Sequence, residues 1–340
     1  MKVMKKKAWV WWGLGIFFAA AVIWFGRYSY GLYQERLATE ESIRNSDYEV
    51  AASAEGTLIA FQGKEYERDP SVKAYLILGV DSLGELEQRV TGDGGQADAI
   101  FLVAYDAARS KVKVLMIPRD TMTPITLTDL SGKVLGKDVQ HITLAYGYGD
   151  GRELSCERMT EAVSELLGGL DINGYLAMNR SMIPELNDLV GGVTVHIETD
   201  ELEHRDPELV KGNDVTLDGR QAETFLRYRN IEIDHSALTR MSRQQQYMEG
   251  YFNAVQKQAA KDDQTIVRLM SLIENHMITN LSKDQYLNIG KAILYSEEKF
   301  GKDDMLTIPG EGVVTEFYDE YHHDPEGTQQ MVLDMFYREK

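Results

Sequence analysis

Three runs of apolar residues lie close together between positions 72 and 117. They are Val72–Val80, Ala99–Tyr105 and Lys111–Ile117. Runs of this length, rich in β-branched and aliphatic residues and bounded by turn-forming residues, are typical of buried strands. Only residues 106–110 separate the second run from the third, which is a suitable length for a hairpin. The pattern therefore predicts three neighbouring strands in one sheet.

Charged residues stand at the ends of these strands. Asp81 follows the first, Asp98 opens the second, and Arg119 and Asp120 follow the third. In an antiparallel pair the start of one strand lies beside the end of its partner. We therefore expect Asp98, Arg119 and Asp120 at one end of the sheet, where strands start or end; this end is called the sheet edge below. Asp81 lies beside them if the first strand is also antiparallel. Such a group suits a cation together with an anion such as phosphate. The alternative is that these are ordinary charged residues that end strands in solvent.

The first 25 residues have a different pattern, in which lysines precede an uninterrupted apolar segment. Residues 8–25 carry no charge, and as a helix they span about 27 Å, close to the hydrocarbon thickness of a bilayer. The four lysines before them predict a cytoplasmic amino terminus, with the rest of the chain outside. A cleaved signal peptide is the alternative, because Ala19–Ala21 offers small residues. Apolar residues continue to Phe25, which favours an uncleaved transmembrane anchor.

Downstream, strand-like and helix-like patterns alternate. Residues 120–137 are expected to form a loop, and Glu153–Leu167 a helix that ends at two glycines. This alternation predicts an α/β fold in which a mixed sheet is layered between helices. The predicted parts are a cytoplasmic tail (1–7), a transmembrane helix (8–25), a stalk (26–70), a catalytic α/β domain (71–256) and a helical extension (257–340).

Arginines gather in the stretch between residues 227 and 243. A helix is expected over 217–230, and Arg227 and Arg229, two residues apart, straddle its end. Three further side chains share one face of the next helix by their spacing: Arg240, Arg243 and Gln244. Guanidinium groups bind phosphate oxygens in a planar, bidentate manner. The alternative is that these arginines form ion pairs with surrounding acidic residues.

The composition narrows the classes of function. The net charge is −18 at pH 7, and a body this acidic repels nucleic-acid phosphates, which require a basic footprint. The sequence contains no P-loop, no Gly-x-Ser-x-Gly nucleophile motif, and neither an HExxH nor a paired CxxC zinc motif. Nucleic acid is therefore excluded as a partner, and any metal is expected to bind carboxylates.

Several short segments occur in the order found in one known family. They are Leu76–Asp81 (LILGVD), Gln96–Val103 (QADAIFLV), Met116–Thr121 (MIPRDT), Leu217–Ala222 (LDGRQA), Arg227–Arg229 (RYR) and Arg240–Gln245 (RMSRQQ). The ordered set, spread from Lys73 to about Phe252, resembles the LytR-CpsA-Psr family of cell-envelope proteins.

The resemblance implies an activity. Members of the family are anchored in the cell membrane by one amino-terminal helix, and their catalytic domain is extracellular. They transfer glycopolymers, such as teichoic acid or capsule polysaccharide, from an undecaprenyl-pyrophosphate carrier to peptidoglycan. The family's lipid tail lies in an apolar tunnel between sheet and helices. The chain is thus expected to be a glycopolymer phosphotransferase that uses Mg2+.

The resemblance also implies roles for individual residues. Asp81 and Asp98 match the acids associated with the magnesium ion, and Asp98, Arg119 and Asp120 are the catalytic candidates. Either Asp98 or Asp120 is the base that accepts the proton of the attacking sugar hydroxyl. The residues matched to the pyrophosphate are Arg119, Arg227, Arg229 and Arg240, with Gln244 or Gln245 alongside. Arg243 is added to them because its spacing puts it on the same helical face as Arg240.

One segment departs from the family pattern. The chain has Gln96-Ala97-Asp98-Ala99 where the family usually has Arg-Ser-Asp-Thr, so an arginine that would contact the pyrophosphate is missing. Loss of a charged hydrogen bond costs about 1.5–3 kcal/mol, which weakens binding but need not abolish transfer. Two alternatives stay open: a lipid-pyrophosphate hydrolase that uses water on the same site, and a catalytically silent protein that binds or senses lipid phosphates.

Overall fold

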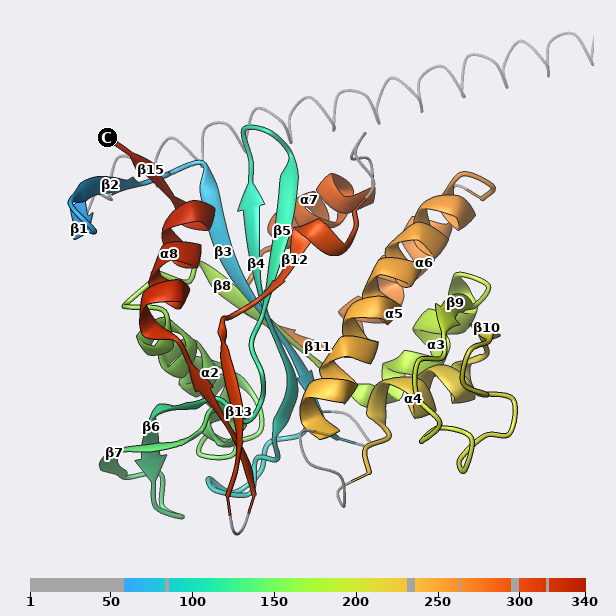
Figure 1. The fold of residues 1–340 in the computed structure, drawn as a ribbon, viewed down its shortest axis with the longest axis horizontal. Helices are drawn as coiled ribbons and strands as arrows, with labels where there is room; N and C mark the ends of the chain where they lie inside the picture. Colours follow the sequence, from blue (N-terminus) through green and yellow to red (C-terminus); the bar gives the residue numbers. More distant parts are fainter. Residues whose placement is uncertain (1–57, 83–85, 231–235, 263, 295–299, 316–317) are drawn as a thin grey trace, which may run out of the picture. The chain divides into compact units, whose positions relative to one another are not determined.

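A six-stranded sheet forms the centre of the computed structural model, which describes residues 58–82, 86–230, 236–262, 264–294, 300–315 and 318–340 (Figure 1). β3 is antiparallel to β4 and β4 to β5, as the apolar runs predicted, while β8 is parallel to β3 and β12 to β5. The sheet is therefore mixed. Its strands, in spatial order, are β11 (Met277–Thr279), β8 (Gly174–Asn179), β3 (Val72–Val80), β4 (Ala97–Asp106), β5 (Lys111–Met116) and β12 (Met305–Thr307).

Helices cover both faces of this sheet. Helices α2 (Glu153–Leu166) and α8 (Pro325–Phe336) pack on one face, and α5 (Ser236–Ala259) and α7 (Lys283–Leu294) pack on the other (Figure 1). Successive side chains of a strand point to opposite faces. Leu76 and Leu78 therefore join the core under α2 and α8, whereas Tyr75 joins the core under α7. The predicted arrangement of a mixed sheet layered between helices is present.

A smaller hydrophobic cluster lies beside α5. It combines the antiparallel pair β9 (Val193–His196) and β10 (Asp214–Leu217) with α3 (Ile183–Leu189), α4 (Gly219–Arg227) and α6 (Thr265–Glu274). Helix α4 begins at a capping box, in which the Asp218 carboxylate accepts a hydrogen bond from the Gln221 backbone N–H at 2.7 Å. The helix ends at Arg227, so Arg227 and Arg229 straddle its end as predicted.

The expectation of a loop over residues 120–137 was wrong. These residues form most of a hairpin of β6 (Met122–Thr128) and β7 (Val134–His141), followed by the 3₁₀ helix η1 (Ile142–Tyr146). The Thr and Asp residues, with Gly132 and Gly136, suggested a loop, but Ile125 and Thr126 are buried, and β6 packs against α2. Threonine is β-branched and fits a half-buried strand, so tertiary packing decided this segment.

The two ends of the described chain lie in one small sheet. Strand β2 (Lys64–Arg68) pairs with β1 (Leu58–Phe61) and with β15 (Tyr337–Glu339).

Residues 58–340 form one compact unit, and the division predicted after residue 256 falls inside α5. The remaining elements are the hairpin β13 (Gly310–Val314) and β14 (Asp319–His323), with the 3₁₀ helices η2 (Arg180–Met182) and η3 (Lys302–Asp304).

The membrane anchor predicted over residues 8–25 lies outside the described residues. Among residues 58–340, apart from the gaps given above, no helix is both long and apolar enough to cross a bilayer.

Candidate active site

The register of the central sheet brings charged residues from four strands to one edge. The last residue of β3 pairs with the first residue of β4 and with the last residue of β8. Asp81 therefore lies level with Gln96 and Arg180, and its backbone N–H donates to the Gln96 carbonyl at 3.1 Å. Arg119 and Asp120 arrive at the same edge because β5 is antiparallel to β4.

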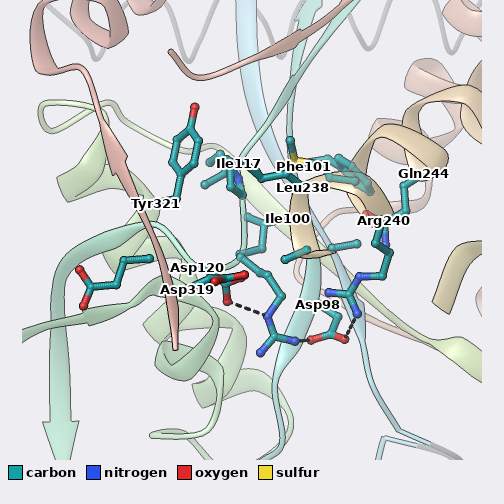
Figure 2. A pocket seen from close by; sticks show the side chains of 16 residues that line it. Asp98, Ile100, Phe101, Ile117, Asp120, Leu238, Arg240, Gln244, Asp319 and Tyr321 are labelled. Atoms are coloured by element: carbon teal, nitrogen blue, oxygen red, sulfur yellow. Dashed lines mark hydrogen bonds and ion pairs between the residues drawn. The ribbon is translucent and has the colours of Figure 1, made fainter. Parts of the chain in front are cut away.

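Asp98 is held by two arginines from distant parts of the chain, as Figure 2 shows. Its Oδ1 accepts a hydrogen bond from Arg119 Nη1, and its Oδ2 accepts one from Arg240 Nη1 on α5 at 2.9 Å. Arg119 also donates from Nε to Asp120 Oδ1 at 3.2 Å and from Nη2 to Gln96 Oε1 at 2.6 Å. The structure thus brings together the three side chains expected at this edge and adds Arg240.

Arg240 is a buried charge, with a residue exposure of only 6%. Burial lowers the pKa of its guanidinium, while the Asp98 carboxylate acts in the opposite direction. Arginine stays protonated in proteins, so Arg240 keeps a full positive charge at a position from which water is largely excluded. An anion that enters this environment interacts with the charge more strongly than it would in water.

Asp81 is the centre of a second group of charges. Its Oδ1 lies 2.8 Å from Arg180 Nε and 3.7 Å from Arg227 Nη2. Both arginines also approach Glu223 Oε1 on α4, at 3.7 and 3.2 Å. Arg180 was missed by the sequence analysis because it lies outside the recognisable segments. Its position depends on the parallel pairing of β8 with β3, which no local pattern predicts.

The other predicted arginines differ in what they contact. Arg229 Nη1 lies 4.0 Å from Asp120 Oδ2 and so reaches the edge of the Asp98 group. Arg243 instead donates to the Tyr228 carbonyl and lies 3.4 Å from Glu201 Oε1. It therefore holds the segment that follows α4, and it is not among the residues that line the cleft described next.

A cleft with apolar walls adjoins the Asp98 group. Its volume is about 470 Å³, including the space open to solvent. Asp98, Arg119, Asp120 and Arg240 line one side, and Figure 2 shows apolar side chains of the sheet and of α5 beside them. These other walls are formed by Ile100, Phe101, Ile117, Leu238 and Met241, with the polar side chain of Gln244.

The carboxy-terminal hairpin forms a further wall, which the sequence analysis did not predict. Asp319, Glu320 and Tyr321 of β14 line the cleft. The Tyr321 backbone N–H donates to the Asp120 carbonyl at 2.8 Å, so the hairpin is fixed beside a candidate catalytic residue. Its sequence, DEYHH, carries no motif, and the contact joins residues 201 positions apart. Only the three-dimensional structure reveals it.

The predicted magnesium site depends on Asp81 and Asp98. Among the residues that the structure describes, no group of three or more acidic, histidine or cysteine side chains is arranged to hold a metal ion. Mg2+ usually keeps several waters and binds through one or two carboxylates together with substrate phosphates. The donor set therefore fits magnesium only in combination with a phosphate ligand, with Asp81 and Asp98 as the residues that would hold it.

A sequence model of the LytR_cpsA_psr family matches residues 34–335. The chain belongs to the LytR_cpsA_psr family. Among proteins similar to this LytR_cpsA_psr chain is TagU of Bacillus anthracis, named polyisoprenyl-teichoic acid–peptidoglycan teichoic acid transferase. The two are 27% identical over 328 residues, which cover 96% of this chain and 95% of TagU.

Two solved structures share the fold of this LytR_cpsA_psr chain. The protein gbs0355 from Streptococcus agalactiae has a TM-score of 0.59 at 20% identity and covers 79% of this chain and 90% of its own. TagV of B. subtilis has a TM-score of 0.57 at 20% identity and covers 78% of this chain and 98% of its own. The similarity extends to the mixed α/β arrangement of sheet and helices.

Proposed function

We propose that this protein is a membrane-anchored phosphotransferase that attaches a glycopolymer, carried on a polyprenyl pyrophosphate, to peptidoglycan. The proposal rests on one observation: Arg119 and Arg240 meet at Asp98 on one side of a cleft that has apolar walls from the sheet and from α5. A polyprenyl pyrophosphate has the matching parts. Its anionic head group suits the guanidinium groups, and its hydrocarbon chain suits the apolar walls.

The name of TagU supports the same class of reaction, since TagU aligns with nearly the whole chain. Teichoic acid or a related anionic glycopolymer is the proposed cargo. Residues 8–25 would anchor the protein in the cell membrane, and the four lysines before them favour an extracellular active site.

In the proposed reaction, a sugar hydroxyl of the acceptor attacks the phosphorus that carries the glycopolymer. The bond between this phosphorus and the oxygen of the lipid phosphate breaks, polyprenyl phosphate leaves, and a carboxylate takes the hydroxyl proton. Arg119 and Arg240 offset the negative charge that develops on the leaving phosphate. A magnesium ion at Asp81 and Asp98 would supply additional positive charge.

Asp120 is better placed than Asp98 to act as the base. Both oxygens of Asp98 accept hydrogen bonds from arginines, which suits it to position Arg119 and Arg240. Asp120 accepts from Arg119 through Oδ1, whereas its Oδ2 lies 4.0 Å from Arg229 Nη1. That oxygen has room to accept a proton from a bound hydroxyl. We therefore propose Asp120 as the base.

A transfer assay tests the proposal. Full-length protein is incubated with a fluorescent glycopolymer linked to polyprenyl pyrophosphate, with peptidoglycan and magnesium, and the label bound to peptidoglycan is measured. Arg119→Ala should lower transfer by about 100-fold, because a group that stabilises the developing charge is lost. The control is Arg158→Ala, which removes a partly buried arginine of α2 that pairs with Glu161 at 3.2 Å, outside the site.

The other outcomes separate the alternatives. Free phosphorylated polymer without attachment to peptidoglycan would favour the hydrolase. Saturable binding of the donor without turnover would favour the silent binding protein. Undiminished transfer by Arg119→Ala would show that the proposed site is wrong.

A further inference from the structure

Arg180 is a partly buried cation at the sheet edge for which the proposed reaction has no role so far. Its side chain is only 13% exposed, and its Nε lies 2.8 Å from Asp81 Oδ1. Within the described part of the chain, its buried Nε and Nη1 nevertheless have no hydrogen-bond partner of suitable geometry. A buried donor without a partner is costly, and charged donors are the most costly. Such a group beside the candidate site requires an explanation, and a bound anion provides one.

The sheet places Arg180 where a phosphate would be expected. Strands β8, β3 and β4 are neighbours, so the backbones at Arg180, Asp81 and Gln96 follow one another across the same edge. Adjacent strands are about 4.8 Å apart, so Arg180 and Gln96 lie about 10 Å apart on either side of Asp81. Arg180 reaches Asp81, and Gln96 reaches Arg119. An anion between the two groups of charges would thus have Arg180 on one side and Arg119 on the other.

The balance of charge leads to the same conclusion. The ion pairs at this edge join five arginines to four carboxylates, so this group of pairs has one positive charge in excess, while Asp319 and Glu320 line the adjoining cleft from β14. Gln96 brings no charge to this edge, and without Arg180 the group would be neutral. The carboxylates are Asp81, Asp98, Asp120 and Glu223, and the arginines are Arg119, Arg180, Arg227, Arg229 and Arg240.

We propose that Arg180 binds the diphosphate of the lipid carrier on the Asp81 side of the site, and that it supplies the positive charge that Gln96 does not. This inference rests on the proposed function. A guanidinium from the end of β8 thereby takes over a contact that an arginine at the start of β4 would make. Loss of Arg180 weakens binding of the diphosphate head group and leaves the apolar contacts unchanged.

A titration with farnesyl pyrophosphate, a short polyprenyl pyrophosphate, tests this role in the full-length protein. Arg180→Gln should weaken the affinity about 10- to 100-fold, the size expected for a lost charged hydrogen bond. Arg180→Lys should have an intermediate effect, because it keeps the charge and loses the planar fork. Arg158→Gln is the matched control, because Arg158 Nε is also buried without a hydrogen bond within the described residues. It should bind like the wild type.

A second substitution distinguishes ligand binding from a purely structural role. Gln96→Arg, introduced into the Arg180→Gln protein, should restore most of the lost affinity. If Arg180 served only to hold Asp81 and Glu223 in place, an arginine at position 96 would restore nothing, and the inference would be overturned. Unchanged affinity in a folded Arg180→Gln or Arg180→Lys variant would overturn it as well. If the wild type binds no farnesyl pyrophosphate, the proposed function itself fails, and the role of Arg180 fails with it.

Discussion

Two arginines one turn apart on α5 show how the partner of a side chain determines its role. Arg240 and Arg243 are both buried, and burial lowers the pKa of both guanidinium groups. Arg240 donates to Asp98 and lines the cleft. Arg243 donates to the Tyr228 carbonyl, and its charge is balanced by Glu201. The sequence spacing put both on one helical face, but of the two only Arg240 lines the cleft.

The two variants Arg240→Gln and Arg243→Gln should therefore behave differently. Arg240→Gln should weaken farnesyl pyrophosphate binding about 10- to 100-fold because a charged donor to the phosphate is lost. Arg243→Gln should leave the affinity within about threefold but lower the free energy of unfolding by about 3 kcal/mol, because the largely covered Glu201 carboxylate loses its ion-pair partner. Calorimetric titration and urea unfolding measure the two effects. Equal losses of affinity would show that Arg243 also contacts the ligand.

Magnesium should bind in a manner that depends on the diphosphate. The two carboxylates alone make a poor site, since Asp98 is engaged by two arginines. We expect the affinity for Mg2+ to rise at least about tenfold when farnesyl pyrophosphate is present, and Asp81→Asn to remove this gain. Titration of Mg2+ with and without the pyrophosphate provides the measurement. Tight binding of magnesium to the protein alone would contradict the expectation.

At the scale of secondary structure, helix ends place several site residues. Arg227 is the last residue of α4, and the capping box at Asp218 fixes the start of the same helix. Glu223, which contacts both Arg180 and Arg227, lies on this helix four residues before Arg227. The position of these charges therefore depends on a helix of only nine residues, and its amino-terminal cap is a large part of its local stability.

Loss of this cap should affect both stability and binding. Asp218→Ala should lower the free energy of unfolding by about 1 kcal/mol and weaken farnesyl pyrophosphate binding about two- to fivefold. The control is Asp324→Ala on α8, where the Asp324 carboxylate accepts from the Glu326 N–H at 3.1 Å. Its stability should fall by a similar amount, but α8 carries no residue of the site, so binding should be unchanged. Equal effects of the two variants on binding would argue against a special role of α4.

The sequence alone was sufficient to predict those parts of the fold and the site that depend on local pattern and on the pairing of neighbouring strands. The runs that became β3, β4 and β5 were recognisable, and antiparallel pairing alone brought Asp98, Arg119 and Asp120 to one edge. Arg180 was missed because its place depends on a parallel pairing between segments far apart in the chain. Tyr321 was missed for the same reason, since it reaches the site through a bridge to residue 121. Long-range pairings of this kind leave no periodic signal in the sequence.

At the scale of the whole molecule, an ion pair joins the two ends of the described chain. Arg338 Nη2 donates to Asp69 Oδ1 at 2.7 Å, where β15 pairs with β2. Burial alone would raise the pKa of Asp69, but hydrogen bonds from Ser71 and Arg338 outweigh burial, so the pKa is lowered. The carboxylate is therefore ionised at neutral pH, and the ion pair contributes to folding.

The contribution of this pair should depend on pH in a defined direction. The pKa of Asp69 is lower in the folded state, so the ionised carboxylate stabilises the folded protein. This stabilisation is complete above the unfolded-state pKa of about 3.9 and is lost as the pH falls through the folded-state pKa. Arg338→Ala should cost about 1–3 kcal/mol at pH 6 and less at pH 3, where the unfolded-state carboxyl is mostly protonated. Urea unfolding at both pH values tests this. Lys340→Ala, which removes an exposed pair with Glu67, should change stability by less than about 0.5 kcal/mol.

The place of β12 at the edge of the central sheet has a consequence for biosynthesis. A ribosome delivers β3, β4 and β5 early, but β12, which covers the outer side of β5, comes from residues 305–307. Until then β5 has an unpaired edge, which is a template for association with other nascent chains. The hairpin that closes on Asp120 emerges later still. A polypeptide that stops before residue 305 therefore lacks both the strand that covers β5 and the hairpin that lines the cleft, and we expect it to associate with other chains.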